Sequence, residues 1–284
     1  MMLQSQIPQL PDDGLVAPEV GPWVETKYRL VDGYNRLFSK GMKRKWHCRV
    51  YIDLYAGSGR SKIRGTNRII SGSPLLALSV PDRFDKYIFC EANATYLAVL
   101  QQRVHALRPD TDVRFISGDC NLRIDEIRAE IPMHSPGHKV LSFCFMDPYR
   151  LDIQFATVQA LSQRYIDFML LLALDMDARR NEDFYSQPDN SRVDEFLGVP
   201  DWRDRWSAAR AKGMPFQCFL AQEYASRMET LGYKKVPLAK MKEVRSHEKN
   251  LPLYHLAFFS RHDLGYKLWN EVLRYRIDQQ SLGI

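Results

Sequence analysis

The chain has few cysteines, and none stands at a spacing typical of a metal site or a disulfide framework. Five cysteines occur in 284 residues, at positions 48, 90, 120, 144 and 218. Their number is odd, and no two form a C-x-x-C pair, which argues against a secreted disulfide-stabilised domain and against a zinc ribbon. We therefore expect reduced thiols, a cytoplasmic protein and no metal centre.

Long apolar runs are also missing. The most apolar stretch, residues 168–174, lies between Asp167 and Asp175 and has the length of a strand. A membrane span needs about 20 apolar residues, so we expect no membrane association. The first 14 residues have neither the basic nor the apolar segment of a secretory signal, and they are expected to form a loose tail.

Charge and composition leave a broad choice of partners. Hydrophobic residues make up 45% and charged residues 26% of the chain, which is ordinary for a globular protein and excludes global disorder. The formal net charge is +6. This mild excess of positive charge permits a nucleic-acid partner without requiring one.

Strands and helices alternate over the first half of the chain. Alternation of this kind predicts βαβ units and a parallel sheet with helices on both faces. Strands are expected at residues 49–54, 86–91, 113–116, 140–146 and 166–174. Helices are expected at residues 74–78, 94–107, 122–131 and 153–163.

The periodicity divides the chain into four segments. They are an N-terminal tail and helix (1–45, with the helix at 23–38), an α/β core (46–174), a mostly helical insertion or lid (175–232), and a final segment (233–284). The final segment is expected to add strands at 234–238 and 253–259, a basic linker at 239–250 and a helix at 266–275.

Four consecutive predicted strands end in an acidic residue, at Asp53, Glu91, Asp119 and Asp147. Ligands of open parallel sheets bind at the carboxyl ends of the strands, so these residues mark a candidate site. The first of them opens a glycine loop, Asp53-Leu54-Tyr55-Ala56-Gly57-Ser58-Gly59. The loop lacks the third glycine of a dinucleotide-binding fingerprint, which argues against NAD and FAD and favours a ligand without phosphates.

The next two strand ends fit a nucleoside. Glu91, followed by Ala92, can accept hydrogen bonds from both hydroxyls of a ribose, and Asp119 with Cys120 can flank an adenine. A ribose and an adenine without phosphates indicate S-adenosylmethionine. The alternative is that these acids only cap helices or face water.

The fourth strand end fits a methyl acceptor. An aromatic amine is a poor nucleophile, and the Asp147 carboxylate with the Pro148 carbonyl can accept its two protons and free its lone pair. The ring of Tyr149 can stack on the base and orient it. The alternative is a helix cap with an aromatic neighbour.

These motifs resemble class I S-adenosylmethionine-dependent methyltransferases, whose motif I is similar to the loop from Asp53 to Gly59 and whose motif IV is similar to Asp147-Pro148-Tyr149. The wider pattern resembles the three-Cys-motif partner family. It includes Lys27 and Tyr28 on the first helix, and then DLYAGSGR, SGSPLLAL, FCEAN, MDPYRLDI, YIDFMLLLALDMDARRN, VDEFLG and DW. This resemblance implies a Rossmann-like methyltransferase fold, with a mostly parallel seven-stranded sheet and helical additions. It also implies a separate three-cysteine partner protein, encoded nearby.

Basic residues accompany the candidate site. Arg60, Lys62 and Arg64 follow the glycines in a stretch expected to be a loop (60–71), and Arg180 follows the fifth strand. They are candidates for holding the phosphates of an RNA or DNA substrate, although a solvated loop has the same composition.

The sequence therefore predicts a methyltransferase that acts on an amino group of a nucleic-acid base or a similar heteroaromatic acceptor. Asp53 and the loop from Tyr55 to Gly59 would hold the methionine end of the cofactor. Two rivals stay open: a non-catalytic S-adenosylmethionine- or RNA-binding scaffold for a three-cysteine protein, and a nicotinamide-dependent oxidoreductase.

Overall fold

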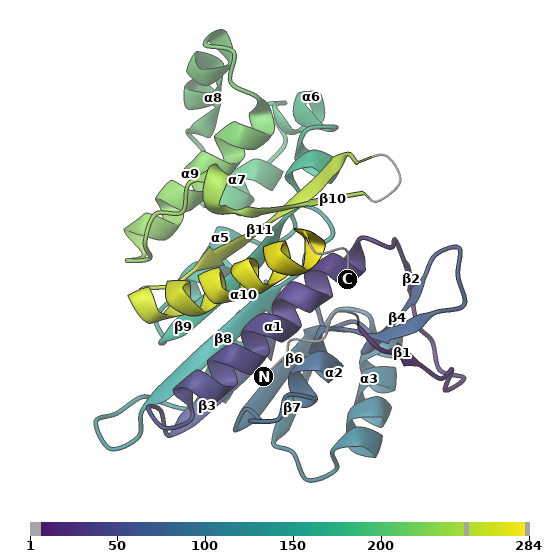
Figure 1. Cartoon of the computed structure of the whole chain (residues 1–284). Coiled ribbons are helices and arrows are strands. Elements are labelled where there is room, and N and C mark those ends of the chain that lie inside the picture. The colour runs from purple at the N-terminus through teal and green to yellow at the C-terminus, as the bar shows by residue number, and fades with distance from the viewer. Residues whose placement is uncertain (1–6, 247–249, 282–284) are drawn as a thin grey trace.

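A seven-stranded, mostly parallel β-sheet forms the centre of the molecule (Figure 1). The computed structural model describes residues 7–246 and 250–281, except for the side chains of Met176 and residues 275–281. In spatial order the strands are β10 (Lys242–Arg245), β11 (Pro252–Phe259), β9 (Ile166–Leu172), β8 (Val140–Met146), β3 (Cys48–Asp53), β6 (Lys86–Glu91) and β7 (Val113–Ser117). The five strands from β9 to β7 are parallel, whereas β11 is antiparallel to both of its neighbours.

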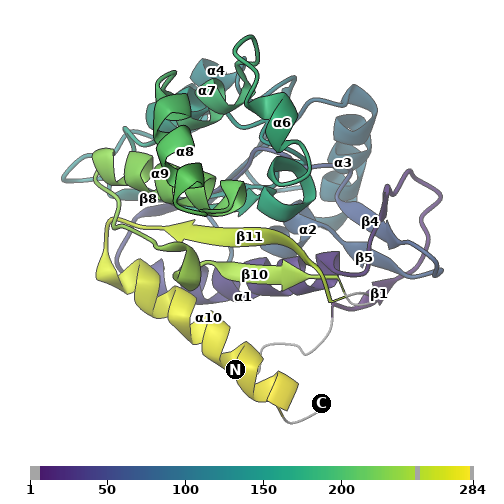
Figure 2. The same ribbon diagram turned by 90° about the horizontal axis from the view of Figure 1, so that it is seen from above.

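Helices cover both faces of this sheet, which confirms the predicted Rossmann-like architecture. One face carries α1 (Val24–Met42), α2 (Ser73–Leu78), α3 (Ala94–Leu107) and α10 (Asp263–Ser281). The other carries α4 (Ile124–Glu130), α5 (Phe155–Leu161), α7 (Arg192–Leu197) and α9 (Phe216–Thr230), with α8 (Trp202–Ala211) packed on α9. Figure 2 shows β11 between these two layers. Since both faces are covered, every residue of β3, β8 and β9 is buried, and these strands are nearly continuous apolar runs.

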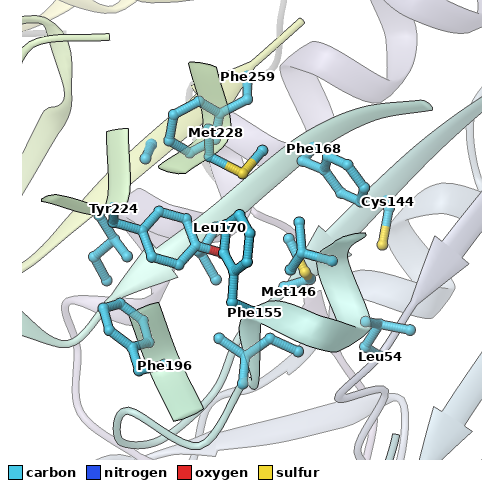
Figure 3. Packing of buried hydrophobic residues seen from close by; sticks show 14 of the residues in the cluster. Leu54, Cys144, Met146, Phe155, Phe168, Leu170, Phe196, Tyr224, Met228 and Phe259 are labelled. Carbon is cyan, nitrogen blue, oxygen red and sulfur yellow. The ribbon is translucent and has the colours of Figure 1, made fainter. Parts of the chain in front are cut away.

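Aromatic packing joins the helical insertion to the sheet. Tyr224 of α9 lies with its ring centroid 5.9 Å from that of Phe155 on α5 and 4.7 Å from that of Phe196 on α7 (Figure 3). Phe168 of β9 belongs to the same apolar cluster. The insertion therefore shares one core with the sheet, and it is positioned by that core next to the strand ends.

Two stretches expected to be irregular form a second, four-stranded sheet. Its strands, in spatial order, are β1 (Gln9–Leu10), β5 (Ile69–Ser71), β4 (Arg60–Ile63) and β2 (Glu19–Val20). The expectation of a loose N-terminal tail was therefore wrong for residues 7–14, while residues 1–6 of that tail lie outside the described residues. The expectation of a loop over residues 60–71 was also wrong. The reason is burial: Ile63 and Ile70 pack with Ile7 and Val24 in a small core of their own.

The end of the chain needs a further correction. The strand expected at residues 234–238 is absent: Lys234–Pro237 is irregular, and a short 3₁₀ helix, η2 (Leu238–Lys240), follows. Pro237 lacks the backbone N–H that a sheet ladder needs. The edge strand is instead β10, within the expected linker. After β9 the chain forms a π-helical turn, η1 (Leu174–Ala178), and α6 (Glu182–Tyr185).

Candidate active site

The carboxyl ends of β3 and β6 bring the glycine loop and Glu91 together. Both Glu91 carboxylate oxygens accept backbone hydrogen bonds, from the Gly57 N–H at 2.8 Å and from the Asn93 N–H at 2.8 Å. Asn93 in turn caps α3 by accepting from the Tyr96 N–H. The adjacent parallel strands β3 and β6 thus place a carboxylate against the loop, as the order of the motifs predicts.

A cavity of about 260 Å³ opens beside this contact. Its lining includes Tyr55, Glu91, Ala92, Asp119 and Cys120. Five of the predicted cofactor residues therefore share one cavity. The Asp119 carboxylate also accepts from the Asn121 N–H at 2.8 Å, within the turn that precedes α4, and Asp119 does not cap that helix, whose N-cap is Arg123.

The glycines of the loop have separate roles. Gly57 has a φ of 62°, and a Cβ added there would meet no atom within 4 Å. Gly59 has a φ of 84°, and its Cβ would lie 2.8 Å from Leu100 Cδ1. Positive φ favours glycine at both positions, but only Gly59 is also enclosed by side chains. Open space remains on the Gly57 side, next to Glu91. Ala56 and Ser58 are buried within the loop itself.

Asp53 lies beneath the loop and is fully buried. Its carboxylate accepts from the Tyr55 N–H at 3.3 Å and from the Tyr51 hydroxyl at 3.2 Å. Loss of water on burial, with a smaller effect of the nearby Asp147 charge, raises the pKa of Asp53 to about 7, against the lowering effect of the hydrogen bond to the Ser73 hydroxyl. Near neutral pH, Asp53 is therefore present in both its protonated and its charged form.

Asp147 follows β8 and forms an ion pair with Lys27 of α1. The side chains of Lys27 and Asp147 are only 8% and 18% exposed. Tyr28 and Tyr254 are close enough to the pair to influence the same charges. Sequence reasoning assigned no site role to Lys27 or Tyr254. The signal for Lys27 was present, since a lysine occupies the apolar face of α1 together with Val24 and Val31.

Tyr149 faces a second cavity, of about 270 Å³, on the other side of the same loop. The Tyr149 side chain is 77% exposed, and Arg150, Arg180 and Phe184 line the cavity with it. The structure thus brings Tyr149 and Arg180 together. Pro148 is buried between Asp147 and Tyr149.

The loop that divides the two cavities is anchored at Leu151. Its N–H donates to the Asp177 carboxylate at 3.1 Å, and that carboxylate also accepts from the Tyr185 hydroxyl at 2.7 Å. The next residue, Asp152, lines the first cavity. One short loop therefore bounds the candidate cofactor cavity on one side and the Tyr149 cavity on the other.

The basic residues after the glycines lie elsewhere. Arg60 donates to the Pro11 carbonyl at 2.8 Å and pairs with Asp13 at 3.2 Å, and Lys62 lies 3.7 Å from Glu19. Arg64 is exposed on the turn between β4 and β5. None of the three lines either of the two cavities.

Within residues 7–246 and 250–281, no cluster of three or more histidine, cysteine or acidic side chains is arranged to hold a metal ion. No helix in that part of the chain has the length and apolar character to cross a membrane.

No protein-family model and no curated protein matches the chain. Solved structures do. An O-methyltransferase from Bacillus cereus in complex with SAH is 11% identical, and the match covers 87% of this chain and 84% of that one at a TM-score of 0.45. A cyclopropane synthase from Mycobacterium tuberculosis is 12% identical over 90% and 70% of the two chains, at 0.41. A putative methylase from Haemophilus influenzae is 17% identical over 51% and 80%, at 0.34. At these values the likeness assigns no activity to this chain.

Proposed function

We propose that the protein is an S-adenosylmethionine-dependent methyltransferase acting on an amino group of a nucleic-acid base or a similar heteroaromatic acceptor. The observation that carries this proposal is the convergence of three strand ends on one edge of the sheet. There, the glycine loop with Glu91 borders one cavity, and the Asp147-Pro148-Tyr149 loop separates that cavity from a second.

The residues present fit the cofactor. A carboxylate has about four acceptor positions, so Glu91 retains capacity for a ribose diol after binding two backbone N–H groups. The cavity of about 260 Å³ beside Ala92, Asp119 and Cys120 is slightly smaller than the roughly 300 Å³ of the smallest pockets for drug-sized ligands, so it suits the nucleoside part and not the whole cofactor. The open side of Gly57 leaves space for the methionine end. When bound, S-adenosylmethionine supplies an electrophilic methyl group on a sulfonium.

The second cavity fits a flat, anionic acceptor. Tyr149 and Phe184 are both exposed aromatic side chains, and each offers a face for stacking on a base. Arg150 and Arg180 line the same cavity and can hold phosphate oxygens. The Asp147 carboxylate and the Pro148 carbonyl would accept hydrogen bonds from the two N–H groups of the acceptor amine. Together these groups favour a nucleotide in a single strand over an uncharged small molecule.

The ion pair between Lys27 and Asp147 favours a second candidate, because Lys27 already engages the predicted catalytic carboxylate. In this alternative the chain is a non-catalytic S-adenosylmethionine- or RNA-binding partner of a three-cysteine protein, as the family resemblance implies. The two candidates differ in the effect of Asp147→Asn, which strongly slows methyl transfer by an enzyme but leaves partner binding by a scaffold unchanged.

Calorimetric titration with S-adenosylmethionine and S-adenosylhomocysteine tests the cofactor site. We expect micromolar binding, weakened about 10- to 100-fold by Glu91→Ala, because a hydrogen bond to a charged group contributes about 1.5–3 kcal/mol. Glu229→Gln, on the exposed end of α9, is the matched control and keeps full affinity. Absence of binding at millimolar ligand would remove the basis of the proposal.

A further inference from the structure

Lys27 and Asp147 are 120 residues apart in the sequence and meet just after β8, next to the loop that separates the two cavities but in the lining of neither. Lys27 reaches this point from the first helix, which lies across the sheet beside α10 (Figure 1). Its Nζ contacts Asp147 Oδ2, while the Asp147 side chain keeps some exposure. One side of the carboxylate is therefore held by the lysine, and carboxylate surface remains open to a ligand.

The groups around the pair come from three elements. Tyr28 of α1, Asp53 of β3 and Tyr254 of β11 all act on these charges. The Tyr254 hydroxyl is buried and makes no hydrogen bond to any residue that the structure describes. Burial lowers the pKa of Lys27, but the charge and hydrogen bond of Asp147, together with Tyr28 and Tyr254, outweigh burial and leave the pKa raised. Lys27 therefore pairs with Asp147 as an ammonium group.

Stability does not account for this pair. The cost of removing two charges from water roughly cancels their attraction, and apolar replacements of buried ion pairs are often neutral or stabilising. The pair also lies at the end of β8, where the next residues separate the two cavities. Its position points to a role in the chemistry of the site.

We propose that Lys27 is a positioning residue for methyl transfer, which fixes the orientation of the Asp147 carboxylate so that its open side accepts an N–H of the acceptor amine. This inference rests on the proposed function. The acceptor nitrogen forms a bond to the methyl carbon with its lone pair, while the carbon–sulfur bond breaks and its electron pair stays on sulfur. The methylated nitrogen then releases one proton to water. Lys27 itself neither gives nor takes a proton.

A double-mutant cycle tests this role. The variants are Lys27→Met, Lys27→Arg, Asp147→Asn and the double variant Lys27→Met/Asp147→Asn. The measurements are calorimetric affinity for S-adenosylmethionine, transfer of labelled methyl groups to a pool of single-stranded oligoribonucleotides, and thermal unfolding. Lys27→Arg preserves the charge, and the double variant removes the buried charge that Lys27→Met leaves unpaired, so folding failure of one variant does not end the test.

We expect Lys27→Met to reduce transfer at least 100-fold with cofactor affinity within threefold of wild type, and Lys27→Arg to stay within tenfold. The double variant should be no slower than Asp147→Asn, and it should regain the melting temperature lost in Lys27→Met. Wild-type transfer rates in Lys27→Met, or losses that multiply in the double variant, would overturn the role of Lys27. If the wild type binds cofactor but methylates no oligonucleotide, the proposed acceptor class fails, and the role of Lys27 with it.

Discussion

Asp53 is the residue whose protonation most directly links the site to the stability of the fold. Its pKa rises from 3.8 to about 7 on burial. Between pH 3.8 and about pH 7, Asp53 has lost its proton in the unfolded chain but retains it in the folded protein. The unfolding free energy therefore falls as pH rises through this range, and it levels off above about pH 7. Between pH 5 and pH 7 we expect a loss of about 2 kcal/mol from this group, because each full unit of pKa difference is equivalent to about 1.4 kcal/mol and the folded Asp53 is half deprotonated by pH 7.

Urea unfolding of wild type and Asp53→Asn at pH 5 and pH 8 measures this effect. The asparagine keeps the size and the acceptor oxygen of Asp53 but does not titrate. As pH rises, the unfolding free energy of the wild type should therefore fall relative to that of Asp53→Asn. The other carboxyl groups titrate in both proteins, so their effects cancel in this comparison. An identical difference at both pH values would show that Asp53 does not retain its proton.

For single residues, the sequence predicted which side chains lie at the strand ends, but it did not predict which other side chains they contact. The order of strands and helices is local information, and it placed Glu91 beside the glycine loop. The Lys27–Asp147 pair depends on how α1 lies across the sheet, which no local pattern contains. The Tyr254 hydroxyl could not be predicted either, because its position depends on an antiparallel strand inserted next to β9.

In the glycine loop, mutations can distinguish the need for a positive φ from the need for empty space beside the ligand. Gly59→Ala combines positive φ with a Cβ 2.8 Å from Leu100 Cδ1, and we expect it to cost about 2–4 kcal/mol of stability. Gly57→Ala has the same backbone penalty of about 1–2 kcal/mol but no clash.

Denaturant unfolding measures the loss of stability, and calorimetry measures the loss of cofactor affinity. Gly57→Ala should lose cofactor affinity beyond its small loss of stability, because its methyl group points into the open space near Glu91. Equal stability of the two variants would contradict the enclosure of Gly59, and unchanged affinity in Gly57→Ala would place the ligand elsewhere.

Elements with a strong apolar period were predictable, and charged or short elements were not. The predicted helix over residues 94–107 coincides with α3, and the strand at 140–146 coincides with β8. β10 is an edge strand whose sequence, Lys-Glu-Val-Arg, buries only Val244 fully, so it has no apolar pattern to detect. The strands β1 and β2 have two residues each, and they exist only because the β4–β5 ribbon pairs with them.

On the scale of the whole molecule, basic runs that are similar in sequence lie in different places. Lys40, Lys43, Arg44 and Lys45 precede the first residue of β3, and therefore lie at the amino edge of the sheet, opposite the candidate site. Arg60 and Lys62 belong to the small sheet. These basic residues therefore do not form one surface that could bind a nucleic acid. The arginines that accompany the Tyr149 cavity come from two separate loops instead.

The N-terminal segment and the glycine loop are joined through one buried arginine of α3. Arg103, 3% exposed, forms a forked pair with Asp13, at 2.9 and 2.8 Å, and donates to the carbonyls of Leu15, Val16 and Ser58. The hydrogen bond from Arg103 lowers the pKa of Asp13 to about 2. Residues 13–16, α3 and the loop thus behave as one unit, although they are far apart in sequence.

Arg103→Lys tests whether this junction preorganises the cofactor site. A lysine keeps the charge but cannot form the fork, so several buried carbonyls lose a donor, and we expect a loss of about 2–4 kcal/mol in stability. Because Ser58 lies between the two loop glycines, S-adenosylmethionine affinity should also fall, by about tenfold. Arg44→Lys, exposed at the opposite edge of the sheet, is the control and should change neither quantity. A loss of stability with unchanged affinity would mean that Glu91 alone fixes the loop, and that the N-terminal segment serves folding and not binding.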